Sequence, residues 1–247
     1  MRTIALPIVV FFLTVISCAA DGKVVSYKSG DESVQGLLYT PAGKAPFPGI
    51  VVVHEYWGLS DWIKEQSSKL AEQGYAALAV DLYRGKVADN PDLAHELMRG
   101  LPEDRAARDL HAAFEYLSSL PNVKKDRLGA IGWCMGGGHA LLMAVHEPTL
   151  VADAINYGHL VTDSGQLNKI NAAILGIFGG QDRGIPVEDV KRFEQQLKQS
   201  GKRVQIIIYP NAGHAFENPV NKAGYRPDDA ADAWKHTLDF LAGTLKK

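Results

Sequence analysis

The sequence predicts an α/β fold in which a mostly parallel central sheet carries helices on both faces. Two short strands are expected at 23–28 and 33–40, on either side of the turn Ser29-Gly30-Asp31. The run 49–53 is continuous and rich in β-branched residues, which is typical of a strand buried on both faces. Helical and strand patterns then alternate to the end of the chain, as they do where helices connect parallel strands.

The alternation begins with a helix at 61–74, whose final glycine is a stop signal. In sheets of this kind, reactive residues gather in the loops beyond the carboxyl ends of the strands. We therefore look for functional residues directly after each strand. The remaining strands are expected at 76–81, 127–132, 151–157, 172–178 and 204–209, and the remaining helices at 102–120, 134–146, 187–197 and 228–245.

The composition is that of an ordinary globular protein. The chain has 247 residues, of which 46% are hydrophobic and 22% charged, and its net charge is -2. A charge this close to zero implies no general attraction to nucleic acid or to an anionic membrane. We expect one α/β domain over residues 21–247, with no nucleic-acid partner.

Residues 1–20 have the layout of a bacterial secretory signal. Arg2 gives a positive start, an apolar run covers 4–16, and the small residues Ser17-Cys18-Ala19-Ala20 close the segment. The run is short for an uncleaved membrane anchor, which is the alternative. Val15-Ile16-Ser17-Cys18 also resembles a lipobox. We therefore expect export to the periplasm or a lipid anchor at Cys18 in the bacterial envelope.

The chain holds two cysteines, and one of them lies in the predicted signal. A mature protein would keep Cys134 with no partner, so a disulfide framework is excluded. A free thiol in an oxidising compartment is expected to be either buried or used in chemistry.

The strongest catalytic signal is Gly132-Trp133-Cys134-Met135-Gly136, placed between a predicted strand and a predicted helix. It is the motif G-x-S-x-G with cysteine in place of serine. The positive end of the helix favours a thiolate at Cys134, and the N–H of Met135 is placed to donate to an oxyanion. The alternative is a buried structural cysteine before a glycine-rich turn.

A nucleophile of this kind needs a base and an acid that orients the base, in the chain order nucleophile, acid, histidine. Asp182 and His214 each follow a predicted strand and stand in that order. Alternatively, Asp182 is a turn acid ahead of a helix, and His214 is a loop histidine without an ionic role.

Five motifs together resemble the dienelactone hydrolase family of α/β-hydrolases, over nearly all of the chain after the predicted signal. They are His54-Glu55-Tyr56-Trp57-Gly58-Leu59, Asp81-Leu82-Tyr83-Arg84-Gly85, Gly132-Trp133-Cys134-Met135-Gly136-Gly137, Gly180-Gln181-Asp182 and Gly213-His214-Ala215-Phe216.

The resemblance implies further roles in the site. Glu55 would contact the thiol and take its proton when substrate arrives, and Tyr56 would supply a second oxyanion N–H. Trp57, Tyr83 and Arg84 would contact the substrate, with Arg84 gripping a carboxylate. On residue chemistry alone, Glu55 is also a strand-end acid and Arg84 a surface cation.

One position departs from the family pattern. Members that cleave dienelactone carry a second carboxylate-binding arginine four residues after the histidine, and this chain has Asn218 there. The loss of one cation puts dienelactone itself in doubt as the substrate.

The sequence therefore predicts a hydrolase that cleaves a small ester or lactone through a thioester on Cys134, with no metal or organic cofactor. His54-Glu55 is not part of an H-E-x-x-H motif, and His111, His139 and His159 are expected to be structural. The alternatives are an exported esterase that acts on acylated polysaccharide and a binding protein that has lost turnover.

Overall fold

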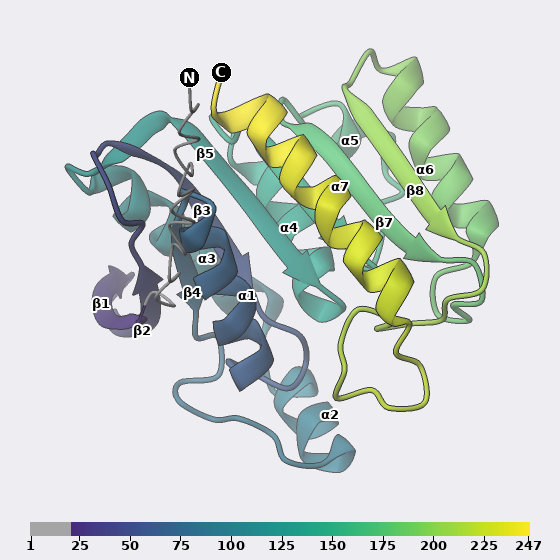
Figure 1. Ribbon diagram of the computed structural model, residues 1–247, viewed down its shortest axis with the longest axis horizontal. Coiled ribbons are helices and arrows are strands. Elements are labelled where there is room, and N and C mark those ends of the chain that lie inside the picture. The colour runs from purple at the N-terminus through teal and green to yellow at the C-terminus, as the bar shows by residue number, and fades with distance from the viewer. Residues whose placement is uncertain (1–20) are drawn as a thin grey trace, which may run out of the picture.

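The structure is a computed structural model that describes residues 21–247. The predicted signal at 1–20, with Cys18, lies outside the described residues. An eight-stranded sheet runs through the molecule in the order β1-β2-β4-β3-β5-β6-β7-β8 (Figure 1). Its strands are β1 Lys23–Ser29, β2 Glu32–Tyr39, β3 Phe47–Val53, β4 Ala76–Val80, β5 Val123–Trp133, β6 Ala152–Asn156, β7 Ala173–Gly179 and β8 Val204–Tyr209.

The sheet is antiparallel at one edge and parallel elsewhere. β1 pairs with β2, and β2 with β4, in antiparallel register, whereas the strands from β4 through β3 to β8 pair in parallel. Every residue of β3, β4 and β7 is buried, which fits strands covered on both faces. β1 alternates buried and exposed positions, as expected where one face meets water.

Helices cover both faces of this sheet. α1 and α7 pack on one face, over β4 and over β5 to β7, and α3 and α4 pack on the other (Figure 1). The helices are α1 Asp61–Glu72, α2 Pro91–Arg99, α3 Glu103–Ser119, α4 Met135–His146, α5 Ser164–Leu167, α6 Val187–Gln199 and α7 Pro227–Leu245.

The predicted fold class and strand–helix order are confirmed. Apart from two additional helices, described below, the elements differ mainly at their ends: β5 begins at Val123 rather than at 127, and α1 ends at Glu72, two residues before Gly74. Gly74 has a φ of 85°, the left-handed backbone that favours glycine after a helix. None of the helices within 21–247 is long and apolar enough to cross a membrane.

Two helices, α2 and α5, have no counterpart among the predicted elements. The start of α2 carries a sequence signal, because Asn90 caps it by accepting a hydrogen bond from the N–H of Leu93 at 3.0 Å. Pro91 then occupies the first turn. α2 lies beyond the carboxyl ends of the strands, where it contributes to the cavity described below.

Candidate active site

The turn that holds Cys134 is tight and strained. Cys134 joins β5 to α4 with a φ of 54°, a left-handed conformation that residues with a side chain rarely adopt. A methyl group on Gly132 would overlap the carbonyl of Gly136, and one on Gly136 would overlap the carbonyl of Val53. The flanking glycines are therefore required by sterics, as the predicted motif demands, and the thiol is presented at the start of a helix.

His214 and Asp182 meet at the same edge of the sheet. His214 Nδ1 lies 2.7 Å from Asp182 Oδ2, and the other carboxylate oxygen accepts the N–H of Gly184 at 2.8 Å. The Asp182 side chain is 2% exposed and that of His214 is 41% exposed. The His214 imidazole is thus open to the cavity, while the Asp182 carboxylate that it contacts is sheltered.

The two groups shift each other's ionisation. Burial alone would lower the pKa of His214, but hydrogen bonds to Asp182 and Cys134, and their charges, raise it to about 10. Burial pushes the pKa of Asp182 up, but its hydrogen bond to His214 and the N–H groups of its own loop bring it below the usual value. The imidazole is therefore held as a cation between the carboxylate and the sulfur.

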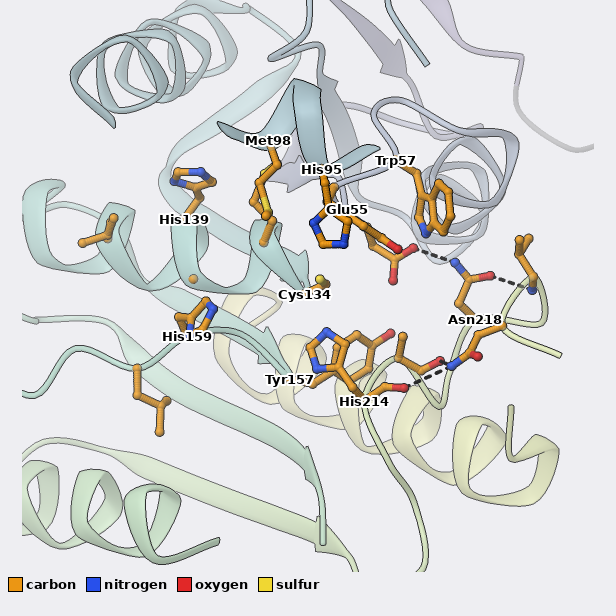
Figure 2. Close-up of a pocket in the computed structure, with 18 of the residues that line it drawn as sticks. Glu55, Trp57, His95, Met98, Cys134, His139, Tyr157, His159, His214 and Asn218 are labelled. Atoms are coloured by element: carbon orange, nitrogen blue, oxygen red, sulfur yellow. Dashed lines mark hydrogen bonds between the residues drawn. The ribbon is translucent and has the colours of Figure 1, made fainter. Parts of the chain in front are cut away.

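Glu55 lies in the same cavity, buried and in contact with one amide. Its Oε2 accepts a hydrogen bond from Asn218 Nδ2 at 2.6 Å (Figure 2). Burial raises the pKa of Glu55 to about 7, although the bond from Asn218 and the charge of His214 oppose the rise. Near neutral pH this carboxyl can therefore exchange a proton.

His54, which precedes Glu55, has a structural role. The N–H of Leu82 donates to its Nε2 at 3.3 Å, so Nδ1 carries the proton and bonds the carbonyl of Glu55 at 2.6 Å. Burial lowers the pKa of His54 to about 4, so the ring is neutral. It fixes the backbone that presents Glu55 and Tyr56.

The predicted oxyanion donors flank the thiol. Met135 and Tyr56 both line the cavity with Cys134. Met135 is the first residue of α4, so its N–H is one of those that have no acceptor within the helix. Trp57 also lines the cavity, as the resemblance implied.

Two predicted substrate contacts are placed elsewhere. Among the described residues that line the cavity, neither Tyr83 nor Arg84 is found. The Tyr83 hydroxyl donates to the sulfur of Met135 at 3.3 Å, outside the cavity lining. Arg84 pairs with Glu32 at 2.8 Å and with Asp109 at 2.7 Å, so its guanidinium is already neutralised by two carboxylates. The guanidinium that the resemblance implied would grip a substrate carboxylate is therefore paired within the protein and lies outside the cavity lining.

The cavity has a volume of about 890 Å³, which is enough for a sizeable organic molecule. Its walls differ in character: Met98, Leu142, Leu160 and Val161 are apolar, and Lys222 is the one Lys or Arg in the lining that the structure describes. Within residues 21–247, no group of His, Cys, Asp and Glu side chains is arranged to hold a metal ion.

Several lining residues were not found from the sequence. His95 and Met98 come from α2, and His139 and His159 line the cavity although they were expected to be structural (Figure 2). His111 instead pairs with Glu147 at 2.8 Å. The Asn90-Pro91 cap signal could have revealed α2, but nothing in the sequence points His139 or His159 toward the thiol.

The sheet order and the strained turn at Cys134 define a protein of the α/β-hydrolase superfamily. Residues 34–245 match the model of the dienelactone hydrolase family, and the chain belongs to that family.

Individual relatives extend over nearly the whole chain. A protein of Methylorubrum extorquens named "Putative carboxymethylenebutenolidase" is 34% identical in an alignment 245 residues long, which covers 92% of this chain and 84% of the relative. A solved structure from Klebsiella pneumoniae, named "Putative Dienelactone Hydrolase", is 29% identical with a TM-score of 0.82, and covers 91% of this chain and 99% of its own. A dienelactone hydrolase-like promiscuous phosphotriesterase from metagenomic libraries is 26% identical with a TM-score of 0.84, over 92% and 99%.

Proposed function

We propose that this protein hydrolyses a small ester or lactone through a thioester on Cys134. The observation that carries the proposal is the placement of Cys134 in a strained strand–helix turn, next to a histidine that Asp182 orients at 2.7 Å. Three groups from three different loops converge there, in the chain order that this fold uses for a catalytic triad.

In the first half of the reaction, the Cys134 thiolate attacks the carbonyl carbon, and the carbonyl oxygen becomes an oxyanion. The N–H groups of Met135 and Tyr56 stabilise that charge. When the intermediate collapses, the bond to the alkoxide breaks, and the His214 imidazolium gives its proton to the leaving oxygen. A lactone opens at this step, whereas an ester loses its alcohol.

In the second half, the now neutral His214 takes a proton from water, and the resulting hydroxide attacks the thioester carbon. The second oxyanion is stabilised by the same donors, and the thiolate leaves. The product is a carboxylic acid, and His214 is again an imidazolium beside the thiolate. Every proton is accounted for by these side chains and water, so the chemistry requires no metal or organic cofactor.

The lining of the cavity supports a substrate that is largely apolar. Aliphatic and aromatic side chains form most of the wall, and Arg84, the expected carboxylate clamp, is engaged with Glu32 and Asp109. We infer that a neutral or singly charged ester or lactone fits this site better than a substrate that needs two cations.

The test is hydrolysis of p-nitrophenyl acetate by wild type and Cys134→Ala, with circular dichroism to confirm that both fold. Loss of the nucleophile of a triad costs several orders of magnitude in rate, and iodoacetamide should label wild type at Cys134. Turnover by folded Cys134→Ala at more than a few per cent of wild type would reject the assignment. Wild type that is inactive on all short esters and lactones would instead favour the binding-protein alternative.

A further inference from the structure

The side of α4 that meets the cavity forms a continuous strip. It consists of Met135, Gly138, His139 and Leu142, which are spaced as residues on one face of a helix and all line the cavity. At about 1.5 Å per residue, the strip runs about 10 Å along the helix axis. It starts beside Cys134, which directly precedes α4. The cavity therefore extends from the sulfur along this helix.

A loop and a second helix form the wall that faces the strip. Leu160 and Val161 line the cavity from the loop that follows β6. This loop is held close to α4, because a methyl group on Gly158 would overlap the backbone of Gly137. Met98 of α2 completes the wall.

The cavity has two arms that meet at the sulfur. Figure 2 shows Met98, His139 and His159 on one side of Cys134, and Trp57 and Asn218 on the other. We name the first the α4 arm. Its lining is mostly apolar, and burial lowers the pKa of His139, so that ring is uncharged near neutral pH. The α4 arm is lined by Met98, His139, Leu142, His159, Leu160 and Val161.

Leu142 closes the far end of the α4 arm. A second, small cavity of about 30 Å³ shares Leu142, His139 and Glu103 with the first, and Leu110 and Met143 also line it. Leu142 is thus part of the partition between the two cavities and limits the length of the arm. The Glu103 carboxylate at this end disfavours an occupant that itself ends in a carboxylate.

The chemistry of the site orients an ester between the two arms. The acyl carbon bonds the sulfur of Cys134, at the start of α4, whereas the leaving oxygen must meet His214, which gives it a proton. His214 begins the loop that carries Asn218 and Lys222 into the cavity lining. An ester therefore directs its alcohol group toward that loop and its acyl group along α4.

We propose that the α4 arm binds the acyl group of the substrate, so that this protein prefers esters whose acyl group is an apolar chain or ring of medium length. Leu142 sets the upper limit of that length. This inference rests on the proposed function, because it requires an acyl group bonded to Cys134.

Hydrolysis of p-nitrophenyl acetate, butyrate, hexanoate and decanoate tests the inference with one leaving group throughout. Each methylene buried in an apolar site raises kcat/KM by up to about fourfold, so wild type should prefer hexanoate to acetate by about tenfold or more. Leu142→Trp fills the arm and should remove this preference. Leu142→Ala joins the two cavities and should shift the ratio of decanoate to hexanoate upward by at least about fourfold, the value of one methylene.

Leu238→Trp is the matched control, since Leu238 is a half-buried leucine of α7, on the other face of the sheet. It should leave every ratio in the acyl series at the wild-type value. Thermal unfolding shows whether each variant folds, and the opposite effects expected of Leu142→Trp and Leu142→Ala mean that either variant alone tests the inference.

A series of alkyl acetates from methyl to hexyl varies the alcohol group instead, with acid release followed by titration. If Leu142 variants change the ratios in this series rather than in the acyl series, the arm binds the alcohol group and the inference is overturned. It is also overturned, with the proposed function intact, if wild type hydrolyses acetate as well as hexanoate or if neither Leu142 variant changes the acyl ratios. Wild type that hydrolyses none of these esters would overturn the proposed function as well.

Discussion

The guanidinium of Arg84 and the carboxylate of Asp109 form an ion pair of 2.7 Å in which the Asp109 side chain is fully buried. Asp109 lies in α3, and Ser29 at the end of β1 also donates to it at 2.5 Å. The pair therefore connects the β4 end of the sheet to a helix and to the edge hairpin. Arg84 has a structural role at the position where the sequence suggested substrate binding.

Arg84→Met is expected to destabilise the protein without changing its substrate preference. Removing Arg84 leaves the fully buried Asp109 carboxylate without its ion-pair partner, although Ser29 still donates to it, and such a loss costs up to about 3–5 kcal/mol. Urea unfolding measures this loss. The ratio of kcat/KM for a carboxylated and a neutral ester should stay at the wild-type value.

Arg108→Met is the control, because Arg108 pairs at 3.2 Å with Glu32, and both side chains are substantially exposed. It should cost no more than about 1 kcal/mol. If Arg84→Met unfolds as wild type does but changes the ratio of kcat/KM for the carboxylated and the neutral ester, the structural role assigned to Arg84 is wrong.

Asp182→Asn is expected to lower both the pKa of His214 and the rate of ester hydrolysis. Asp182 stabilises the imidazolium through its bond at 2.7 Å, so its removal leaves only Cys134 to oppose burial, and the pKa of His214 should fall from about 10. In a triad, the same change costs about four orders of magnitude in kcat. NMR titration of the His214 ring and nitrophenyl ester kinetics measure the two effects.

The exposed Asp189, which pairs with Arg192 on α6, provides the matched control. Asp189→Asn should leave both the titration and the rate unchanged. If the Asp182→Asn variant hydrolysed esters at the wild-type rate, Asp182 would have no part in catalysis.

The sequence predicts the sheet, most helices and the convergence of Cys134, Asp182 and His214, because these follow from local rules. β-branched runs indicate buried strands, and chain order indicates which loops meet at one edge. The ion pair that the Arg84 side chain makes does not follow from such rules. Its partner Asp109 is 25 positions away along the chain, and only the folded sheet brings the two side chains together.

The lining of the cavity was predicted least well, for a related reason. His139 lies within a predicted helix, but its direction depends on how α4 packs on the sheet. α2 is short and strongly amphipathic, with one buried residue, so the sequence contains no long apolar pattern that would predict this helix. The bond between Asn218 and Glu55 joins residues 163 positions apart, and no pattern in the sequence encodes it.

Asp153→Asn is expected to stabilise the protein at neutral pH. Asp153 is fully buried in β6, both of its carboxyl oxygens have no hydrogen-bond partner among the described residues, and burial raises its pKa well above the usual range. In the unfolded chain the group ionises near pH 4. Between those two pKa values folding takes up a proton, so wild-type stability falls as pH rises, by at most about 1.4 kcal/mol per unit.

Urea unfolding of Asp153→Asn and wild type from pH 4 to 8 measures this effect. The two should be closest at pH 4, and the advantage of the variant should grow as pH rises. Asp31→Asn, in the exposed turn between β1 and β2, should show no such trend. A constant difference across the range would mean that Asp153 ionises normally in the folded protein.

The N-terminus is expected to be processed, which follows from Arg2, the apolar run at 4–16 and the small residues that close it. The mature protein should begin at Cys18 with a lipid, or at Asp21 without one. Intact mass of the native protein from a bacterial envelope fraction distinguishes these forms. An unprocessed Met1 form in the cytoplasm would contradict both.

Lys222→Met is expected to weaken selectively the binding of carboxylated substrates. Among the described residues that line the cavity, Lys222 is the one Lys or Arg, and no ion pair engages it. It is therefore the side chain that can pair with a substrate carboxylate. Because Lys222 is exposed, such a contact is worth at most about 1 kcal/mol, or roughly fivefold in KM.

Kinetics on a matched pair of neutral and carboxylated lactones measure this preference. Lys222→Met should raise KM for the carboxylated member and leave the neutral one unchanged, and high salt should reduce the difference in wild type because an exposed charge is screened. A single exposed lysine should bind a carboxylate less tightly than the two arginines that the family resemblance implied, so wild type should also be poor on dienelactone. Efficient cleavage of dienelactone that Lys222→Met does not affect would show that another group in the cavity holds the carboxylate.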